Sequence, residues 1–294
     1  MTTTSREVRF SLPSLEVAGK VWGEPGGVPV IGLHGWLDNA ATFDRLAPAL
    51  QGVHLVALDL AGHGLSDHLP MAGYSLWQQA SIVLQVAEEL GWDRFALLGH
   101  SMGAIISGVL AGSLPERILG AAMIDGLMPF TSEADDAPKQ MARFFKSSLA
   151  VGNKRKPVYD SVEKAVSARV LGGTTPISRD AVSCLVERGL MPDHGGWTWR
   201  TDPQLMLPSA LRFTNHHAVS FIEAIEAPTM LVLANQGVMH KHLQVLDRIE
   251  RFKHIQLHKM DGGHHLHLEE QAPAVAALLN DFYAALPARD VSPA

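Results

Sequence analysis

The sequence has little of several features that would assign it to a familiar class. A single cysteine, Cys184, excludes an internal disulfide, which fits a reducing compartment. No apolar run approaches the roughly 18 residues of a membrane span, and the first ten residues lack the apolar stretch of a signal peptide. The chain has 24 Lys and Arg against 30 Asp and Glu, so it lacks the excess of positive charge that binding to nucleic acid requires. We do not expect nucleic acid as a partner. We therefore expect a soluble cytoplasmic protein without a membrane span.

What is present is a long alternation of short apolar runs and helical patterns. The 294 residues are 47% hydrophobic, enough for one large globular domain. The alternation between residues 28 and 124 favours an α/β fold with a mostly parallel sheet flanked by helices. A helix is predicted over 75–90, because Ser75 and Gln78 form a capping-box pair and Gly91 follows the last apolar position. The predicted strands are 8–12, 15–22, 28–33, 53–58, 95–98, 120–124, 229–233 and 254–257, the first two forming an antiparallel hairpin.

Between residues 126 and 227 the regular succession of short apolar runs that predicts strands is absent. This segment has mostly helical patterns, with breaks at the glycine pairs 172–173 and 195–196. We interpret it as an inserted helical cap. The core domain is then expected to consist of residues 1–125 and 228–294.

Residues 99–103 read Gly-His-Ser-Met-Gly, the pattern of a nucleophile elbow. An apolar strand over 95–98 precedes them, and a stretch of small and apolar residues compatible with a helix follows. At such a strand-to-helix turn the central residue takes strained backbone angles, and flanking glycines let the strand and the helix approach closely. The pattern predicts Ser101 as a nucleophile.

A serine hydroxyl needs a base within hydrogen-bond reach. His264 is the predicted base, because Gly262 and Gly263 place it on a loop after the last predicted strand. His265 and His267 are expected at packing or surface positions. His265 is also the alternative candidate for the base. Three histidines so close also raise the possibility of a metal site, but no carboxylate or cysteine stands at a recognisable ligand spacing. We expect neither a metal nor a cofactor.

An oxyanion hole requires two fixed N–H donors. The N–H of Met102, directly after the serine, is the first candidate. The second is the N–H of Trp36 in the His34-Gly35-Trp36 segment, which follows the predicted strand 28–33. The alternative for this segment is an ordinary turn at a strand end.

These landmarks, together with Asp59-Leu60-Ala61-Gly62-His63-Gly64-Leu65-Ser66, resemble those of the α/β-hydrolase superfamily in the same order. The segments 34–40 and 199–209 further resemble the serine hydrolase-like proteins, a poorly characterised branch. The resemblance implies an eight-stranded, mostly parallel sheet, a helical cap after the sixth strand, and Ser, acid, His catalysis. It also implies that 59–66 is a structural turn, so we assign His63 no catalytic role.

The catalytic acid departs from the usual pattern of the superfamily. Many members carry it after the seventh strand, but here 229–233 is followed by Ala-Asn-Gln-Gly-Val, without a carboxylate. Some members carry it at the end of the sixth strand, where this chain has Asp125. That strand is expected beside the one bearing Ser101, so Asp125 is the predicted acid. Weaker candidates for orienting the imidazole are Asp247, Asp261 and, in a slower dyad, Asn235.

The expected activity is hydrolysis of a small or medium acyl ester or thioester through an acyl-enzyme, falling as the imidazole protonates below about pH 6.5. The partner would be a small-molecule acyl substrate. Haloalkane dehalogenases and epoxide hydrolases are disfavoured, because they carry Asp at the position of Ser101 and the latter use two cap tyrosines, where residues 126–227 contain only Tyr159. Carbon–carbon bond hydrolases, perhydrolases and a slow-turnover ligand sensor stay open as alternatives. The oligomeric state is left open.

Overall fold

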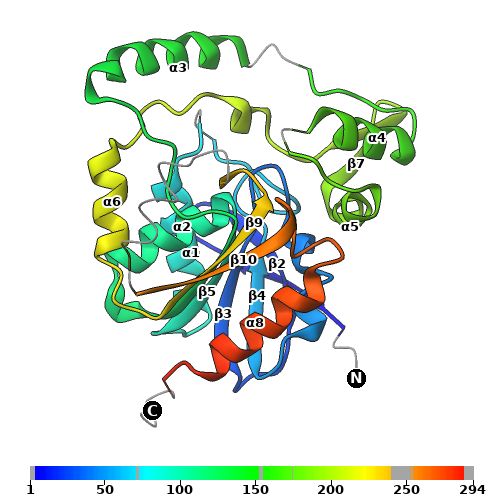
Figure 1. Cartoon of the computed structure of the whole chain (residues 1–294). Helices are drawn as coiled ribbons and strands as arrows, with labels where there is room; N and C mark the ends of the chain where they lie inside the picture. The colour runs from blue at the N-terminus through cyan, green and yellow to red at the C-terminus, as the bar shows by residue number, and fades with distance from the viewer. Residues whose placement is uncertain are drawn as a thin grey trace.

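The computed structural model describes residues 4–70, 73–151, 155–173, 175–239, 252 and 254–287. Its centre is one eight-stranded sheet (Figure 1). Residues 16–22 pair antiparallel with the strand on either side, residues 6–11 and 53–58. The other five neighbouring pairs are parallel, so the predicted mostly parallel sheet is confirmed. The strands, in their order across the sheet, are β1 (Arg6–Ser11), β2 (Glu16–Trp22), β4 (Val53–Leu58), β3 (Val28–Leu33), β5 (Phe95–His100), β6 (Ile118–Ile124), β9 (Thr229–Gln236) and β10 (Ile255–Gly263).

Helices cover both faces of the sheet, which explains why the central strands are apolar on both sides. In β5, Leu97 packs in the cluster with α1 (Leu76–Glu89) and α2 (Met102–Ser113). Leu98, pointing to the opposite face, packs in the cluster with α8 (Ala272–Ala284). Three short 3-10 helices complete the connections in this part of the chain: η1 (Ala40–Phe43), η2 (Ala47–Ala49) and η3 (Pro115–Arg117).

Helix α1 begins where the sequence predicts. Ser75 is the N-cap, its hydroxyl accepts from the Gln78 N–H, and the Gln78 side chain closes the capping box. Gly91 follows the helix with a φ of 65°, a conformation that costs glycine little.

The segment between β6 and β9 contains helices and one hairpin. The two short strands β7 (Leu190–Asp193) and β8 (Gly196–Trp199) pair antiparallel, and the predicted mostly helical cap did not include them. His194 and Gly195 join them with positive φ values of 43° and 82°, the backbone that a tight two-residue turn requires. The remaining elements are η4 (Ala134–Asp136), α3 (Ala137–Val151), α4 (Val162–Gly172), α5 (Arg179–Gly189), η5 (Pro203–Met206) and α6 (Asn215–Glu223).

The helices of this insertion differ in how they meet the core. Helix α6 packs beside α2, and its Ala218 and Ile222 belong to the same apolar cluster as that helix. Helices α4 and α5 form a separate cluster that includes Leu268 of the core. Helix α3 has no buried residue and lies apart from the sheet in Figure 1. The insertion therefore rests on the core through α4, α5 and α6.

Within the described part of the chain, no helix combines the length and apolar character that crossing a membrane requires.

Candidate active site

Ser101 occupies the turn between β5 and α2. Its φ of 51° and ψ of −113° are unusual for a residue with a side chain, and such strain persists only where the surroundings hold it. The Ser101 N–H donates to the carbonyl of Ile124 on the neighbouring strand, at 2.9 Å. The turn is therefore fixed against the end of β6.

Two glycines allow this turn to be tight. A Cβ on Gly99 would lie 2.5 Å from backbone atoms of Ala104, and one on Gly103 would lie 2.0 Å from the Leu33 carbonyl oxygen. The second contact brings the first turn of α2 against the end of β3. The loop that continues from β3, with Trp36, consequently starts beside the elbow.

The two predicted oxyanion donors belong to the two segments that meet here, helix α2 and the loop after β3. Met102 is the first residue of α2, where a backbone N–H has no partner within the helix. Trp36 is tied to the insertion, because its indole Nε1–H donates to the carbonyl of Leu205 at 3.2 Å.

His264 and Asp125 meet at 2.6 Å, from His264 Nδ1 to Asp125 Oδ2. Both are buried, with exposed fractions of 6% and 1%. The path of the chain explains the meeting: the register between β9 and β10 shifts between Met260 and Gly263, and His264 follows that irregularity. Asp125 directly follows β6 and has a φ of 43°.

The end of β9 and the loop after it supply donors to Asp125 where many α/β-hydrolases carry the acid itself. The N–H groups of Ala234 and Val238 donate to the two Asp125 oxygens at 3.2 and 3.0 Å. Gly237 has to lack a side chain, since a Cβ there would lie 2.2 Å from Asp125 Oδ2. These backbone N–H groups hold the Asp125 carboxylate in position for His264.

The other candidates for the acid lie elsewhere. The Asn235 amide donates to Asp261 Oδ1 at 2.6 Å, and both residues, near the ends of β9 and β10, are exposed. Asp247 lies outside the described residues. His265, the alternative base, lies with Nε2 3.5 Å from Asp38 Oδ2.

The rings of His100, His265 and His267 form a cluster with that of His264, and sequence reasoning missed that His100 belongs to it. The ring centroid of His100 lies 4.6, 5.1 and 4.1 Å from those of His264, His265 and His267. His100 Nε2–H donates to the His264 carbonyl at 3.0 Å, so the residue before the serine holds the main chain of His264. Burial and the neighbouring imidazoles lower the pKa of His100 well below its ordinary value.

The histidines of the other loops bond mainly to backbone groups. His34 Nε2 accepts from the Leu60 N–H at 2.9 Å, and His63 Nε2 accepts from the Leu37 N–H at 3.3 Å. Burial lowers the pKa of His34 to about 4 and that of His63 to about 3. Both rings are therefore neutral at physiological pH and hold the turns that surround the site.

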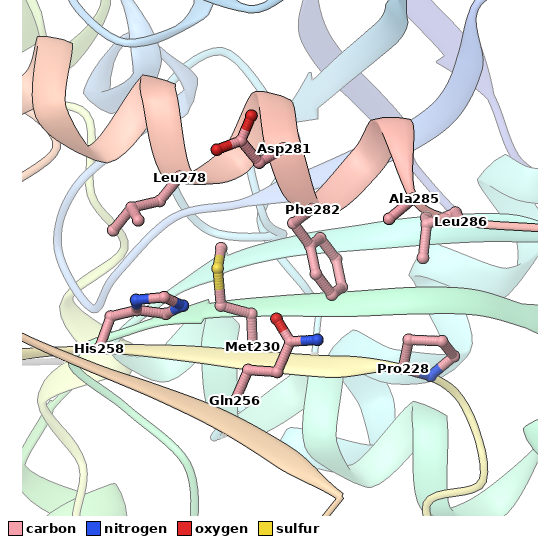
Figure 2. Close-up of a pocket in the computed structure, with 9 residues that line it drawn as sticks. All are labelled: Pro228, Met230, Gln256, His258, Leu278, Asp281, Phe282, Ala285 and Leu286. Carbon is pink, nitrogen blue, oxygen red and sulfur yellow. The ribbon is translucent and has the colours of Figure 1, made fainter.

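A cavity of about 120 Å³ opens beside Ser101 and Asp125. Its walls are mostly apolar, with Met128, Val238 and Met239 among them. A larger cavity, of about 310 Å³, lies between α8 and the starts of β9 and β10, where Met230 and Phe282 face each other (Figure 2). That cavity is at the opposite end of the parallel strands from Ser101, so it is separate from this site.

Among the residues that the structure describes, no group of three or more His, Cys, Asp or Glu is arranged to hold a metal ion.

Comparison with known proteins gives concordant results. A family model described as the alpha/beta hydrolase fold matches residues 28–150. A serine hydrolase-like protein of Danio rerio is 30% identical over 96% of this chain and 90% of its own length. The crystal structure of a hypothetical protein from Pseudomonas aeruginosa is 53% identical, with a TM-score of 0.92 over 95% of this chain and 99% of that one. A thioesterase domain from the curacin biosynthetic pathway, 24% identical with a TM-score of 0.79 over 94% of this chain and 99% of that domain, shares the fold.

Proposed function

Because the chain belongs to the α/β-hydrolase superfamily and, within it, to the serine hydrolase-like proteins, we propose that it hydrolyses acyl esters or thioesters with Ser101 as nucleophile. The observation that carries the proposal is the 2.6 Å hydrogen bond between His264 and Asp125, on the strand next to the one that ends at Ser101. The Asp125 carboxylate fixes this imidazole and directly follows Ile124, whose carbonyl accepts from the Ser101 N–H. A carboxylate, an imidazole and a serine are the groups that together activate a hydroxyl.

The proposed reaction has two halves. His264 Nε2 removes the Ser101 proton as the hydroxyl oxygen attacks the substrate carbonyl, and the tetrahedral oxyanion is held by the N–H groups of Met102 and Trp36. The imidazolium then gives its proton to the departing alcohol or thiol, leaving an acyl-enzyme. A water molecule repeats the sequence and releases the acid. Asp125 keeps the proton of neutral His264 on Nδ1 and stabilises the imidazolium.

The small apolar cavity supports a small or medium acyl group as the substrate. Its volume of about 120 Å³ is below the usual range of drug-sized ligand pockets, roughly 300–1,000 Å³. Met128, Val238 and Met239 offer apolar contacts without a charged partner for an acyl carboxylate. We therefore expect short p-nitrophenyl esters to react faster than long-chain or dicarboxylic ones.

Labelling by a fluorophosphonate probe tests the proposal directly. The wild-type chain is expected to become labelled at Ser101, and Ser101→Ala is expected to abolish labelling and to lower kcat for p-nitrophenyl acetate by a factor on the order of 10⁶. His264→Ala should give a comparable loss, whereas Asp261→Asn, which alters the exposed neighbour of Asn235, should react like wild type. Absence of labelling in a folded wild-type chain contradicts the proposal.

The alternative of a ligand sensor gives a different result in the same experiments. A sensor that keeps this site would bind an ester or acid tightly with almost no turnover, and Ser101→Ala would leave that binding intact. Turnover that disappears in Ser101→Ala favours the hydrolase.

A further inference from the structure

Asp38 is a buried carboxylate that the proposed reaction does not use. It follows β3 in the loop that contains Trp36, with an exposed fraction of 3%. Its Oδ1 accepts from Nη2 of Arg169, on helix α4 of the insertion, at 2.8 Å. Its Oδ2 lies 3.5 Å from His265 Nε2 and 3.7 Å from His100 Nδ1. The carboxylate therefore stands between the insertion and two imidazoles that adjoin His264.

The charge on Asp38 has to be balanced where it is. Burial alone would raise the pKa of this carboxyl, but contacts with His265 and Arg169 lower it below the ordinary range. Asp38 is thus ionised, and a buried charge that loses its partner costs several kcal/mol. Arg169 is permanently charged, and its side chain is largely covered, with an exposed fraction of 18%.

The tautomer of His100 connects the charge of Asp38 with His264. A carbonyl only accepts, so His100 Nε2 carries the proton that it donates to the His264 carbonyl. In the neutral ring Nδ1 is then a bare acceptor, and it has no hydrogen-bond partner among the described residues. This acceptor faces the Asp38 carboxylate, an unfavourable contact that a proton on Nδ1 would relieve. The Arg169 guanidinium on the other Asp38 oxygen balances the carboxylate charge, so that no proton on His100 Nδ1 is needed.

We propose that Asp38 and Arg169 are positioning residues for His264, a pair that keeps His100 neutral and makes helix α4 of the insertion part of the catalytic arrangement. This inference rests on the proposed function for its kinetic meaning, because it concerns the base of that reaction. The pair touches neither the substrate cavity nor Ser101, so it acts through the imidazoles.

Loss of Arg169 has a definite electrostatic consequence. The uncompensated Asp38 carboxylate draws a proton onto His100, whose ring centroid lies 4.6 Å from that of His264. A positive charge this close opposes protonation of His264 and weakens it as a base. The charged and titratable groups that bear on the exchange are Arg169 on α4, His34 and His63 on the core loops, His100 on β5, His264, His265 and His267 after β10, and Asp125 beside His264.

Imidazole NMR of the ¹⁵N-histidine-labelled full chain tests the pair without depending on turnover. In wild type, His100 is expected as the neutral Nε2–H tautomer between pH 5.5 and 8. In Arg169→Gln, His100 should take up a proton at a pH more than one unit higher than in wild type. The double variant Asp38→Asn/Arg169→Gln should return to wild-type behaviour. A folded Arg169→Gln with unchanged histidine titration overturns the inference.

Two comparisons keep the test decisive. If Arg169→Gln does not fold, the double variant should fold, since it has no charge left for the arginine to balance; its failure to fold contradicts the inference. Glu269→Ala is the matched control, because Glu269 accepts from Ser178 at the start of α5 without touching the imidazoles, and its histidine titration should be that of wild type.

Kinetics add a readout that links the pair to the reaction. Arg169→Gln should lower kcat for p-nitrophenyl acetate by roughly tenfold to a hundredfold with little change in KM, and Arg169→Lys should restore part of the loss. A change confined to KM would overturn a positioning role. A wild-type chain that fails to hydrolyse any ester would contradict the proposed function, while the NMR result would still decide the assignment of the pair.

Discussion

At the scale of single residues, strain marks two adjacent strand ends. Ser101 and Asp125 have φ values of 51° and 43°, in a region that side chains seldom adopt. Each is held by a backbone hydrogen bond to the next strand, Ser101 N–H to Ile124 and Asp125 N–H to Val232. The sheet thus imposes both conformations and aims the hydroxyl and the carboxylate away from the strands that carry them.

Replacing Asp125 tests its role at this scale. Asp125→Asn keeps the size of the side chain but exchanges a carboxylate acceptor for an amide, which favours the wrong tautomer of His264. We expect kcat for a p-nitrophenyl ester to fall by about 10⁴ with the circular dichroism spectrum unchanged. A variant as active as wild type would show that the acid lies elsewhere in the chain.

At the scale of elements, the β9 loop shapes the surroundings of Asp125. Gly237→Ala places a methyl group where Asp125 Oδ2 lies, at 2.2 Å, so the carboxylate or the loop has to move. Because misplacement of about 1 Å can cost a hundredfold, we expect kcat to fall by roughly that factor. Gly172→Ala is the control, since a Cβ there meets nothing within 4 Å. Equal activity of both variants would contradict this dependence.

A second element-scale prediction concerns the attachment of helix α5. Arg188 is 5% exposed, and its guanidinium binds the buried carboxylate of Asp59 at 2.8 and 2.9 Å and the exposed carboxylate of Glu7 at 2.6 and 2.7 Å. Arg188→Met leaves the Asp59 charge without its cation, so we expect the free energy of unfolding to drop by about 3–5 kcal/mol in urea titrations. Arg179→Met, which removes only an exposed contact with Ser167, should stay within about 0.5 kcal/mol of wild type.

The sequence predicts elements well where one local pattern decides them. All eight strands of the sheet and the capped helix α1 follow from apolar runs and from the pair Ser75 and Gln78. Strands β9 and β10 extend to Gln236 and Gly263, beyond the predicted 233 and 257, because polar residues and glycines at their ends still pair with the neighbouring strand. The hairpin of β7 and β8 escaped prediction, since each strand has only four residues and β7 contains a proline.

At the scale of the whole molecule, buried neutral histidines make stability depend on pH. The pKa of His34 is lowered to about 4 and those of His63 and His267 to about 3, chiefly by burial. These histidines therefore bind protons near pH 6.5 in the unfolded chain but not in the folded chain. The free energy of unfolding is highest above that pH and falls as the pH drops toward 4.

Each such histidine is expected to cost about 1.4 kcal/mol of unfolding free energy per pH unit below about 6.5. Urea denaturation at pH 7, 6 and 5 measures the slope. His63→Gln, which keeps an acceptor for the Leu37 N–H, should reduce the slope by about one proton. A stability that does not change between pH 7 and 5 would contradict the neutral state of these rings.

Long-range contacts decide how much of the candidate site the sequence reveals. Asp125 was predicted because strand order places the end of β6 beside the elbow, and the structure brings it to His264 across 139 residues. Asp38 and Arg169, 131 residues apart, carry no local signal, since one lies in a loop and the other on an ordinary helix. Only the folded arrangement of the insertion on the core makes them neighbours.

The position of the acid on β6 has a consequence for how this chain can diversify. On the proposed mechanism, the end of β9 and the loop after it contribute main-chain N–H groups to Asp125 and the side chains of Val238 and Met239 to the cavity wall. The side chains of Val238 and Met239 that line the cavity thus follow β9, whereas the proposed acid follows β6. Substitutions at 238 and 239 are open to drift or to directed evolution toward new acyl groups, and Gly237 between the two N–H donors is the position of that loop that has to stay fixed.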